Sequence, residues 1–465
     1  MFQKQTKLIA LLWGLAHLSL AVPVLGKGSD HESRTRAGLR EAERAFSPAM
    51  RNDSSNKPAF QGHIDEYVAY AMNRSPNLRA SFERWRALVH GISRARRLPD
   101  PRITYGYFLL SVETRVGPQR HRVGLKQTFP WPTKLTAGAD ARAARARAAQ
   151  HLFDAETSRV RARVAEAYWD LWLVRETLTV RKELLDISIS SAETVRARLV
   201  VGEASLSDQQ QIDLFIARLE DSIAGLELDE ASASSRLTAA VGAPPGIRTP
   251  TIDSHPHESL PGDTIEELRR LALDHPLLAS FELQAEGADS DARSARAERL
   301  PSFTIGVDWI EVGEASMSGV EDSGRDALVV GAGITLPLWQ RNYKEGVEAH
   351  KAEAAAYRWN GRAAADQSLS TLERAFSAVF DSHRRIRLHR GTLVPQALAA
   401  LDSVLGSYTV SRAGVAQVLM AQRELLELKI VLARANAGHQ IAWARLEETV
   451  GHPIRFRAAE SGASR

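Results

Sequence analysis

The sequence contains no cysteine among its 465 residues. Without thiols the chain can form no disulfide, no thiolate nucleophile and no cysteine-based zinc site, and it offers no cysteine for lipid attachment. Methionine is also scarce, with five residues in the whole chain. A series of soft sulfur ligands for Cu(I) or Ag(I) is therefore excluded as well.

Charge and apolar runs narrow the class of protein further. The formal net charge is +4 and the sequence pI is near 9.3, an excess too small and too dispersed to indicate nucleic-acid binding. Residues 1–26 are typical of a secretory signal, because Lys4 and Lys7 precede an apolar run at 8–25. An uncleaved membrane anchor is the alternative. No later stretch reaches 18 apolar residues, so the mature chain is predicted to lack a transmembrane helix.

Motifs for catalysis are missing too. The sequence has no Gly-rich phosphate loop, no GxSxG and no HExxH, so we predict no enzyme, no catalytic residue and no cofactor. The segment SHPHE offers His255, His257 and Glu258 as metal ligands, but it lies between repeats and is expected to be a solvated loop. No metal site is predicted. Three further histidines are expected to be solvated or packed polar residues: His383, His389 and His439.

What the sequence does contain is an internal duplication. Four segments recur in the same order and at nearly equal spacing: 64–83 with 265–282, 93–107 with 295–309, 124–130 with 331–337, and 239–246 with 448–455. Ordered matches of this kind indicate two structural repeats of about 180–190 residues each.

The duplication sets the expected organisation of the chain. Segment 27–60 is polar and is expected to be flexible and extended or disordered. The connection between the repeats is rich in Pro, Gly, Ser and Thr and is expected to be irregular. The predicted divisions are a signal peptide at 1–26, the flexible segment at 27–60, a first repeat at 61–246, a linker at 247–262, a second repeat at 263–455 and a tail at 456–465.

Each repeat is predicted to run through a helix, two strands, a very long helix, a tip and a returning helix. The first helix is expected at about 64–97. Apolar residues alternate in the strand segments, which is typical of a sheet with one apolar face, and the opposite face carries Gly, Thr, Lys and Arg. Either a soluble sandwich or a membrane barrel with a polar lumen fits this pattern. The strand segments are 103–109, 123–129, 303–309 and 328–336.

Prolines separate the second strand of each repeat from the long helix. Pro130 and Pro337 are expected to end the sheet, because proline cannot donate to a strand ladder. Pro132 suits the first turn of a helix. Trp131 and Trp339 are expected to pack at the junction between barrel and helix or at the inner headgroup level. An ordinary strand–loop–helix turn with a buried tryptophan is the alternative.

The long helices are predicted from composition and heptads. No proline occurs from 133 to 200, and at 1.5 Å per residue this segment would span roughly 100 Å. Pro395 is expected to kink the second copy, which runs from about 339 to 410. Arg181 and Ser188 interrupt the first seam, whose other positions are apolar: Val160, Val164, Ala167, Leu171, Val174, Leu178, Leu185, Ala192, Val195 and Leu199.

Taken together, the duplication, the strand–proline–helix junctions and the tips RLVVGEASLSDQQQ (198–211) and YTVSRAGVAQVLMAQ (408–422) resemble the TolC family of outer-membrane efflux channels. The resemblance covers residues 60–455 and implies a mostly α fold with membrane β-structure. In that fold, a homotrimer shares a twelve-stranded barrel, which continues into a periplasmic α-helical coiled-coil tunnel. The junction FPWP resembles members of the heavy-metal efflux type.

The resemblance also assigns roles to the tips. Gly202 and Gly414 are expected to take positive φ in the reversals, and Ser205 and Asp208 are expected to cap the returning helix. The resemblance implies docking of a periplasmic adaptor at Arg198, Gly202, Ser205, Gly414 and Gln417. It implies a periplasmic gate at the positions Gln417 and Met420, which lack the aspartate of characterised relatives. Asp208 is the candidate substitute for that aspartate.

The expected function is that of a passive outer-membrane duct in a tripartite efflux system or in type I export, within a Gram-negative envelope. The expected partners are an adaptor, an inner-membrane pump of the RND type, outer-membrane lipid and two further copies of the chain. The cargo would be toxic metal cations or drugs. The alternative is a periplasmic coiled-coil adaptor or structural scaffold, which would explain the heptads but not four amphipathic strands.

Overall fold

The computed structural model describes residues 30–51, 60–244 and 252–457. The expected signal peptide and most of the expected tail lie outside the described residues. Among the described residues, no helix combines the length and the apolar character that crossing a bilayer requires.

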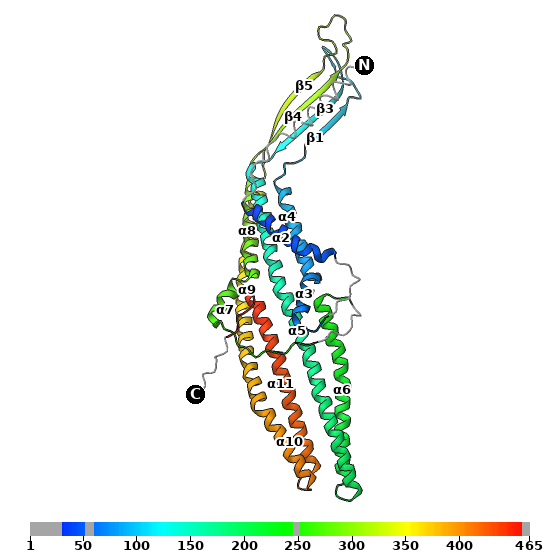
Figure 1. Cartoon of the computed structure of the whole chain (residues 1–465). Coiled ribbons are helices and arrows are strands. Elements are labelled where there is room, and N and C mark those ends of the chain that lie inside the picture. Colours follow the sequence, from blue (N-terminus) through cyan, green and yellow to red (C-terminus); the bar gives the residue numbers. More distant parts are fainter. Residues whose placement is uncertain (1–29, 52–59, 245–251, 458–465) are drawn as a thin grey trace.

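The duplication predicted from the sequence is confirmed by the order of the elements (Figure 1). After α2 (Asp30–Arg51), the first repeat contains α3 (Ile64–Arg74), α4 (Pro76–Ala95), β1 (Arg102–Tyr107), β2 (Glu113–Thr114), β3 (Gly117–Phe129), α5 (Pro132–Val200) and α6 (Leu206–Val241). The second contains α7 (Ile265–Leu273), α8 (Pro276–Ala297), β4 (Ser302–Val312), β5 (Ala327–Thr335), α9 (Gln340–Leu388), the π-helix η1 (His389–Leu393), α10 (Val394–Thr409) and α11 (Val415–Val450).

The molecule is elongated, with the sheet at one end of the helices and the two helical reversals at the other (Figure 1). The sheet is antiparallel in the order β1-β3-β4-β5, and β2 pairs only with β3. Strands β1 and β5 are therefore the open edges of the sheet within one chain. Strand β1 has 6 residues, fewer than the sequence pattern suggested.

The two faces of the sheet differ in chemistry, as the alternation predicted. One face carries exposed apolar side chains, among them Ile103, Tyr105, Ile305, Leu328 and Val330. A row of exposed side chains of this size is unusual on a protein surface that faces water. The strands join the helices where the prolines stand: β3 ends at Phe129 and α5 begins at Pro132.

The tryptophans at these junctions differ between the repeats. The Trp131 ring lies 6.5 Å from the Phe303 ring, measured between centroids, so it packs at the junction between sheet and helix as expected. Trp339 is 73% exposed, and no ring contact forms between it and the described residues. An exposed ring beside the open edge of the sheet is compatible with the headgroup level, so the location expected for Trp339 stays a prediction.

The long helix α5 has 69 residues, as its composition predicted, which corresponds to roughly 100 Å. Its heptad positions Val164 and Leu171 are fully buried. Ser188, which interrupts the heptads, is also fully buried; its hydroxyl donates to the Leu184 carbonyl at 2.8 Å and to the Gln422 amide oxygen at 3.3 Å. The interruption is therefore a polar contact between α5 and α11, satisfied inside the seam.

Three expectations about helices need correction. Segment 27–60 was expected to lack structure, but residues 30–51 form α2, whose Leu39 is buried against Phe82 and Trp85 of α4. The single helix at about 64–97 is two helices, because Pro76 starts a new one. The interruption expected at Pro395 begins earlier, as the π-helix η1. Proline has no N–H to donate within a helix, and the local widening to a π-helix accommodates the missing hydrogen bond.

Candidate functional sites at the helical tips and the inter-repeat strap

The first candidate site is the pair of helical reversals far from the sheet. Gly202 has φ of 78° between α5 and α6, as predicted for a tight reversal. The same expectation for Gly414 is wrong, because Gly414 has φ of −93° and is the N-cap of α11. The left-handed residue of the second reversal is Ser411, with φ of 57°.

Both returning helices are capped by side chains three residues into the helix. The Ser205 hydroxyl accepts from the Asp208 N–H at 3.1 Å, and the Asp208 carboxylate accepts from the Ser205 N–H at 3.0 Å. This reciprocal capping box confirms the capping role predicted for Ser205 and Asp208. At the second tip, the Gln417 side chain accepts from the Gly414 N–H at 3.2 Å.

Arg198 joins the two tips to each other. Its guanidinium lies 4.5 Å from the centroid of the Tyr408 ring and donates to the Thr409 carbonyl at 2.5 Å. A second nitrogen lies 3.5 Å from the Ser411 hydroxyl. The cation–π contact and the hydrogen bonds tie the end of α5 to the end of α10. Arg198 therefore holds the two reversals in one arrangement.

Apolar side chains are exposed around these reversals. Exposed apolar side chains that lie together at one end of a protein mark a surface that contacts another molecule. We call this set the tip patch: Val200, Val201, Leu206, Val410 and Met420.

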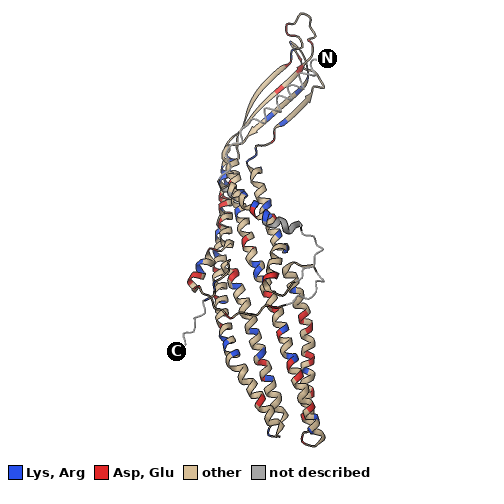
Figure 2. Ribbon diagram, viewed as in Figure 1, with Lys and Arg blue, Asp and Glu red and all other residues tan. Residues whose placement is uncertain are grey.

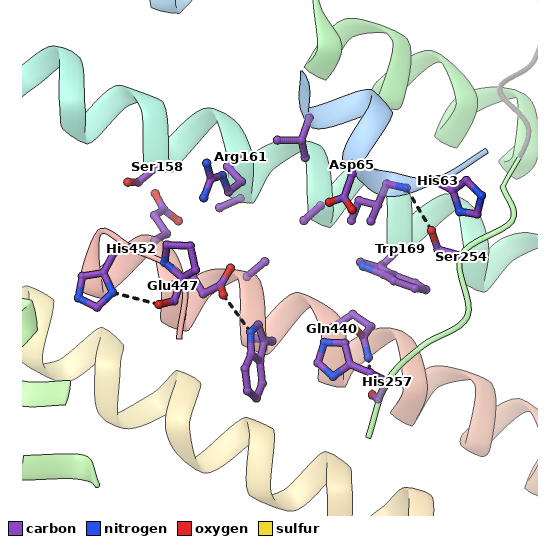
Figure 3. Close-up of a pocket in the computed structure, with 18 of the residues that line it drawn as sticks. His63, Asp65, Ser158, Arg161, Trp169, Ser254, His257, Gln440, Glu447 and His452 are labelled. Atoms are coloured by element: carbon purple, nitrogen blue, oxygen red, sulfur yellow. Dashed lines mark hydrogen bonds between the residues drawn. The ribbon is translucent and has the colours of Figure 1, made fainter. Parts of the chain in front are cut away.

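The second candidate site is the segment 252–260, which we call the inter-repeat strap. It crosses α5, α9 and α11 (Figures 1 and 3). Four successive carbonyls of the strap accept hydrogen bonds from other parts of the fold. The donors are the Gln440 side chain to His257 (2.6 Å), the His383 ring to Glu258 (2.8 Å), the His439 ring to Ser259 (3.1 Å) and the Arg457 N–H to Leu260 (2.8 Å).

The expectation of a solvated loop is therefore wrong for this part of the linker. The Glu258 carboxylate also forms an ion pair with Arg390 of the π-helix η1. His439, one of the three histidines noted in the sequence, is fully buried and its other ring nitrogen lies 3.0 Å from the Ser382 hydroxyl. No sequence motif points to the hydrogen bonds of His383 and His439 with the strap, because these join residues 125 and 180 positions apart.

A cavity of about 750 Å³ lies beside the strap (Figure 3). Its walls include Trp169 of α5, Trp443 of α11 and His257 of the strap. The His257 ring centroid is 5.1 Å from that of Trp443 and 5.6 Å from that of His439. Burial, together with the neighbouring His439, lowers the pKa of His257 to about 4. Among the described residues, no group of three or more His, Asp or Glu has the arrangement of a metal site.

From the half-buried His257 we predict a loss of folding stability in acid. The unfolded chain binds a proton at His257 below pH of about 6.5, whereas the folded chain binds it only near pH 4. The unfolded state therefore binds more protons in this window, and stability falls as the pH falls from about 6.5 to about 4. The contribution is at most about 3 kcal/mol per chain, and solvent access to the ring reduces it.

Urea unfolding of the detergent-solubilised protein at pH 7 and pH 5 measures this effect. We expect His257→Gln to narrow the difference in unfolding free energy between the two pH values. His255→Gln, at an exposed neighbour in the same strap, should leave the difference as in the parent. Equal pH dependence in the parent and in His257→Gln would show that His257 does not carry the effect.

Comparisons with known proteins give the family. A family model described as "Outer membrane efflux protein" matches residues 268–452. The cobalt-zinc-cadmium resistance protein CzcC of Cupriavidus metallidurans is 23% identical over 375 residues, which cover 79% of this chain and 84% of CzcC. The outer membrane efflux protein BepC of Brucella suis is 22% identical over 278 residues, 58% of each chain.

The fold agrees with these matches. A crystal structure of CusC superposes with a TM-score of 0.71 at 16% identity, covering 86% of this chain and 95% of that one. The second repeat therefore matches the outer-membrane efflux protein family, and the whole chain has the fold of TolC-family channels. The fold class expected from the sequence is thereby confirmed: a duplicated, mostly helical chain with a membrane sheet at one end, of the kind found in the trimeric channels of this family.

The similarities also give the general function. The protein is the outer-membrane channel component of a tripartite efflux system, and its helices extend into the periplasm. Channels of this family work with a periplasmic adaptor and an inner-membrane pump. The comparisons support this interpretation and not the periplasmic adaptor or scaffold that the heptads alone left open.

Proposed function

We propose that three copies of this chain form one passive duct for divalent metal cations, fed by an RND-type pump. The observation that carries the metal assignment is the similarity to CzcC, a cobalt-zinc-cadmium resistance protein, over most of both chains. We also propose that the chain itself catalyses no reaction, since the pump supplies the energy.

The open sheet edges support the trimer. In one chain, β1 and β5 each have an unpaired edge, and such edges are normally covered or closed into a barrel. Pairing β1 of one copy with β5 of the next would close a twelve-stranded barrel from three four-stranded sheets. The exposed apolar face of each sheet would then meet lipid.

The helices offer a second surface for the same assembly. On α6, Leu214 and Leu228 are exposed and two heptads apart. Ala217, Ala224 and Ala231 lie in the complementary register of the same exposed stripe. Asp221 interrupts this stripe between the two leucines. An exposed stripe of this spacing, left open by the described parts of the chain, fits a coiled-coil contact with a neighbouring copy.

We propose that an adaptor docks on the tip patch. The predicted docking residues Arg198, Gly202, Ser205, Gly414 and Gln417 would act mainly by shaping this end: Arg198 joins the reversals, and the others form the turns and caps. The apolar side chains of the tip patch would supply the contact surface itself.

We propose that the periplasmic gate of the duct lies at these same tips. Met420 is exposed beside Gln417, and one oxygen of Asp208 is used by its capping bonds. Unchanged single-channel conductance and cation preference in Asp208→Ala would argue against a gating role for Asp208.

The proposed division of the chain follows the same scheme. Repeats 61–246 and 263–455 each contribute two strands to the barrel and one long hairpin to the tunnel. Residues 247–262 connect the two repeats, and the described part of this connection is the strap. Residues 1–26 would be removed on export.

Deletion of the gene in its native host tests the cargo. We expect growth to become more sensitive to cobalt, zinc or cadmium by at least about fourfold in inhibitory concentration, with organic drugs unaffected. Complementation with the intact gene should restore resistance. Sensitisation to drugs alone would overturn the metal assignment while leaving the channel function intact.

A further inference from the structure

The polar face of the sheet carries basic side chains on adjacent strands. Arg102 of β1 is the register partner of Lys126 of β3. Directly opposed residues of an antiparallel pair project from the same face and have Cβ atoms about 5 Å apart. Arg122 stands four residues before Lys126 on β3, and therefore on the same face, about 13 Å away along the strand.

Only part of this charge is balanced. The Arg122 Nε donates to the Asp308 carboxylate at 3.0 Å, and Asp308 is 6% exposed. Within the described part of the chain, no acidic side chain lies within ion-pair distance of Arg102 or Lys126. Like charges placed directly opposite each other weaken a strand pair. A directly opposed pair of cations therefore does not serve the stability of the sheet, and another role has to be sought for it.

Glycines occupy positions beside the charged residues on the polar face of the sheet. Gly106 is the register partner of Arg122, Gly124 of Asp308, and Gly306 of Lys126. A Cβ at Gly124 would lie 2.3 Å from the Asp308 carboxylate, and one at Gly306 would lie 2.9 Å from the Lys126 Cγ. Larger side chains at Gly124 or Gly306 would displace these charged groups, whereas a Cβ at Gly106 would meet no atom within 4 Å. The first two glycines thus let the charged groups lie along the sheet.

Arg102 and Lys126 lie in the part of the sheet nearer the helices, and Arg122 lies near the middle of β3. Figure 2 shows blue segments on the strands there. Most acidic residues at this end of the molecule belong instead to the loops beyond the strands, where Asp322 pairs with Arg325 and the Asp326 carboxylate accepts from the Val312 N–H. The loop end carries charges of both signs, since Arg120 and Arg325 also lie there, whereas on the polar face of the strands Asp308 is the acidic partner of the three basic residues.

We propose that Arg102, Arg122 and Lys126, repeated in three copies, form a cationic collar in the lumen that makes the sheet end of the duct selective for anions. This inference rests on the trimeric duct of the proposed function. Each chain contributes three cations against the single carboxylate of Asp308. Rings of Arg and Lys in a narrow pore favour anions, because the low-dielectric wall focuses their potential.

The collar has a consequence for an exporter of metal cations. Free divalent cations outside the cell meet a positive potential at the collar, so their return through the open duct is opposed. Cations delivered from the pump side cross the same potential under the driving force of active transport, or leave together with anions. The collar would thus hinder re-entry without any moving part.

Reversal potentials in planar lipid bilayers under a tenfold KCl gradient test the collar. We expect the intact trimer to prefer chloride over potassium. The variant Arg102→Gln/Lys126→Gln should lower the chloride-to-potassium permeability ratio by at least about threefold, since two of the three cations per chain are removed. The charge-retaining control Arg102→Lys/Lys126→Arg should keep the parental ratio.

Tripolyphosphate provides a second measurement that needs no variant. Added at micromolar concentration, it should reduce the current of the intact channel, and Arg102→Gln/Lys126→Gln should relieve the block. If Arg102→Gln/Lys126→Gln forms channels with the parental permeability ratio and the parental block by tripolyphosphate, the proposed collar is wrong. The proposed duct would not be affected by that result. Absence of any channel from the intact protein would instead overturn the trimeric duct itself.

Discussion

Lysine at position 330 is expected to prevent assembly of the protein in the outer membrane, whereas lysine at position 331 is expected to be tolerated. Val330 is 71% exposed on the apolar face of β5. Gly331, the next residue, belongs to the opposite face, and a Cβ there would meet no atom within 4 Å. The two substitutions thus place the same charge on opposite sides of one strand.

The expected difference follows from the lipid. A lysine on the lipid-facing side of a membrane strand costs about 2–4 kcal/mol near the bilayer midplane, and three copies multiply this cost. A lysine facing the lumen remains in water. The amount of heat-stable trimer in purified outer membranes measures the outcome. Equal amounts of trimer for both variants would mean that the apolar face of the sheet does not contact lipid.

An acidic residue in the tip patch is expected to abolish efflux without changing the trimer. Leu206, in the first turn of α6, is 62% exposed. Leu206→Asp removes an apolar contact and would place a charge in the adaptor interface. A central apolar anchor is typically worth about 2 kcal/mol or more, which weakens adaptor binding by about 30-fold or more. Resistance of the complemented deletion strain to metals should then fall to the level of the strain without the gene.

Ser207→Asp is the matched control for this experiment. It adds the same charge one residue later, at an exposed position in the same helical turn, where a negative charge suits the helix N-terminus equally well. We expect it to retain at least half of the resistance. Full resistance in Leu206→Asp would exclude the tip patch as the docking surface. Equal loss in both variants would indicate that charge, and not the apolar contact, decides docking.

The sequence predicted the elements that depend on local patterns. The start of α5 at Pro132 follows from the preference of proline for the first helical turn. The capping box of Ser205 and Asp208 follows from spacing within one turn. The sequence did not predict α2, because the polar composition of segment 27–60 indicated disorder. In the structure, Leu39 of this helix packs on α4. Polar composition alone does not show whether a few buried residues anchor a helix.

The sites depended on contacts that no local pattern records. Gly414 was assigned the left-handed position from its residue type, but the second reversal uses Ser411 instead. The strap was assigned to solvent because it lies in the linker between the repeats, yet His383 and His439 bind its carbonyls. A histidine that will be buried looks the same in the sequence as one that will be solvated, because its partners lie more than 100 residues away.

By itself, the sequence determined the duplication, the alternation of the strands, the reach of the helices and the absence of thiol chemistry, since each of these is a periodicity or a composition. Only the tertiary structure decided which charges share a face of the sheet. The pairing of Arg102 with Lys126 and of Arg122 with Asp308 depends on the register between residues that are 24 and 186 positions apart in the sequence. A shift of that register by one residue would move every side chain of a strand to the other face.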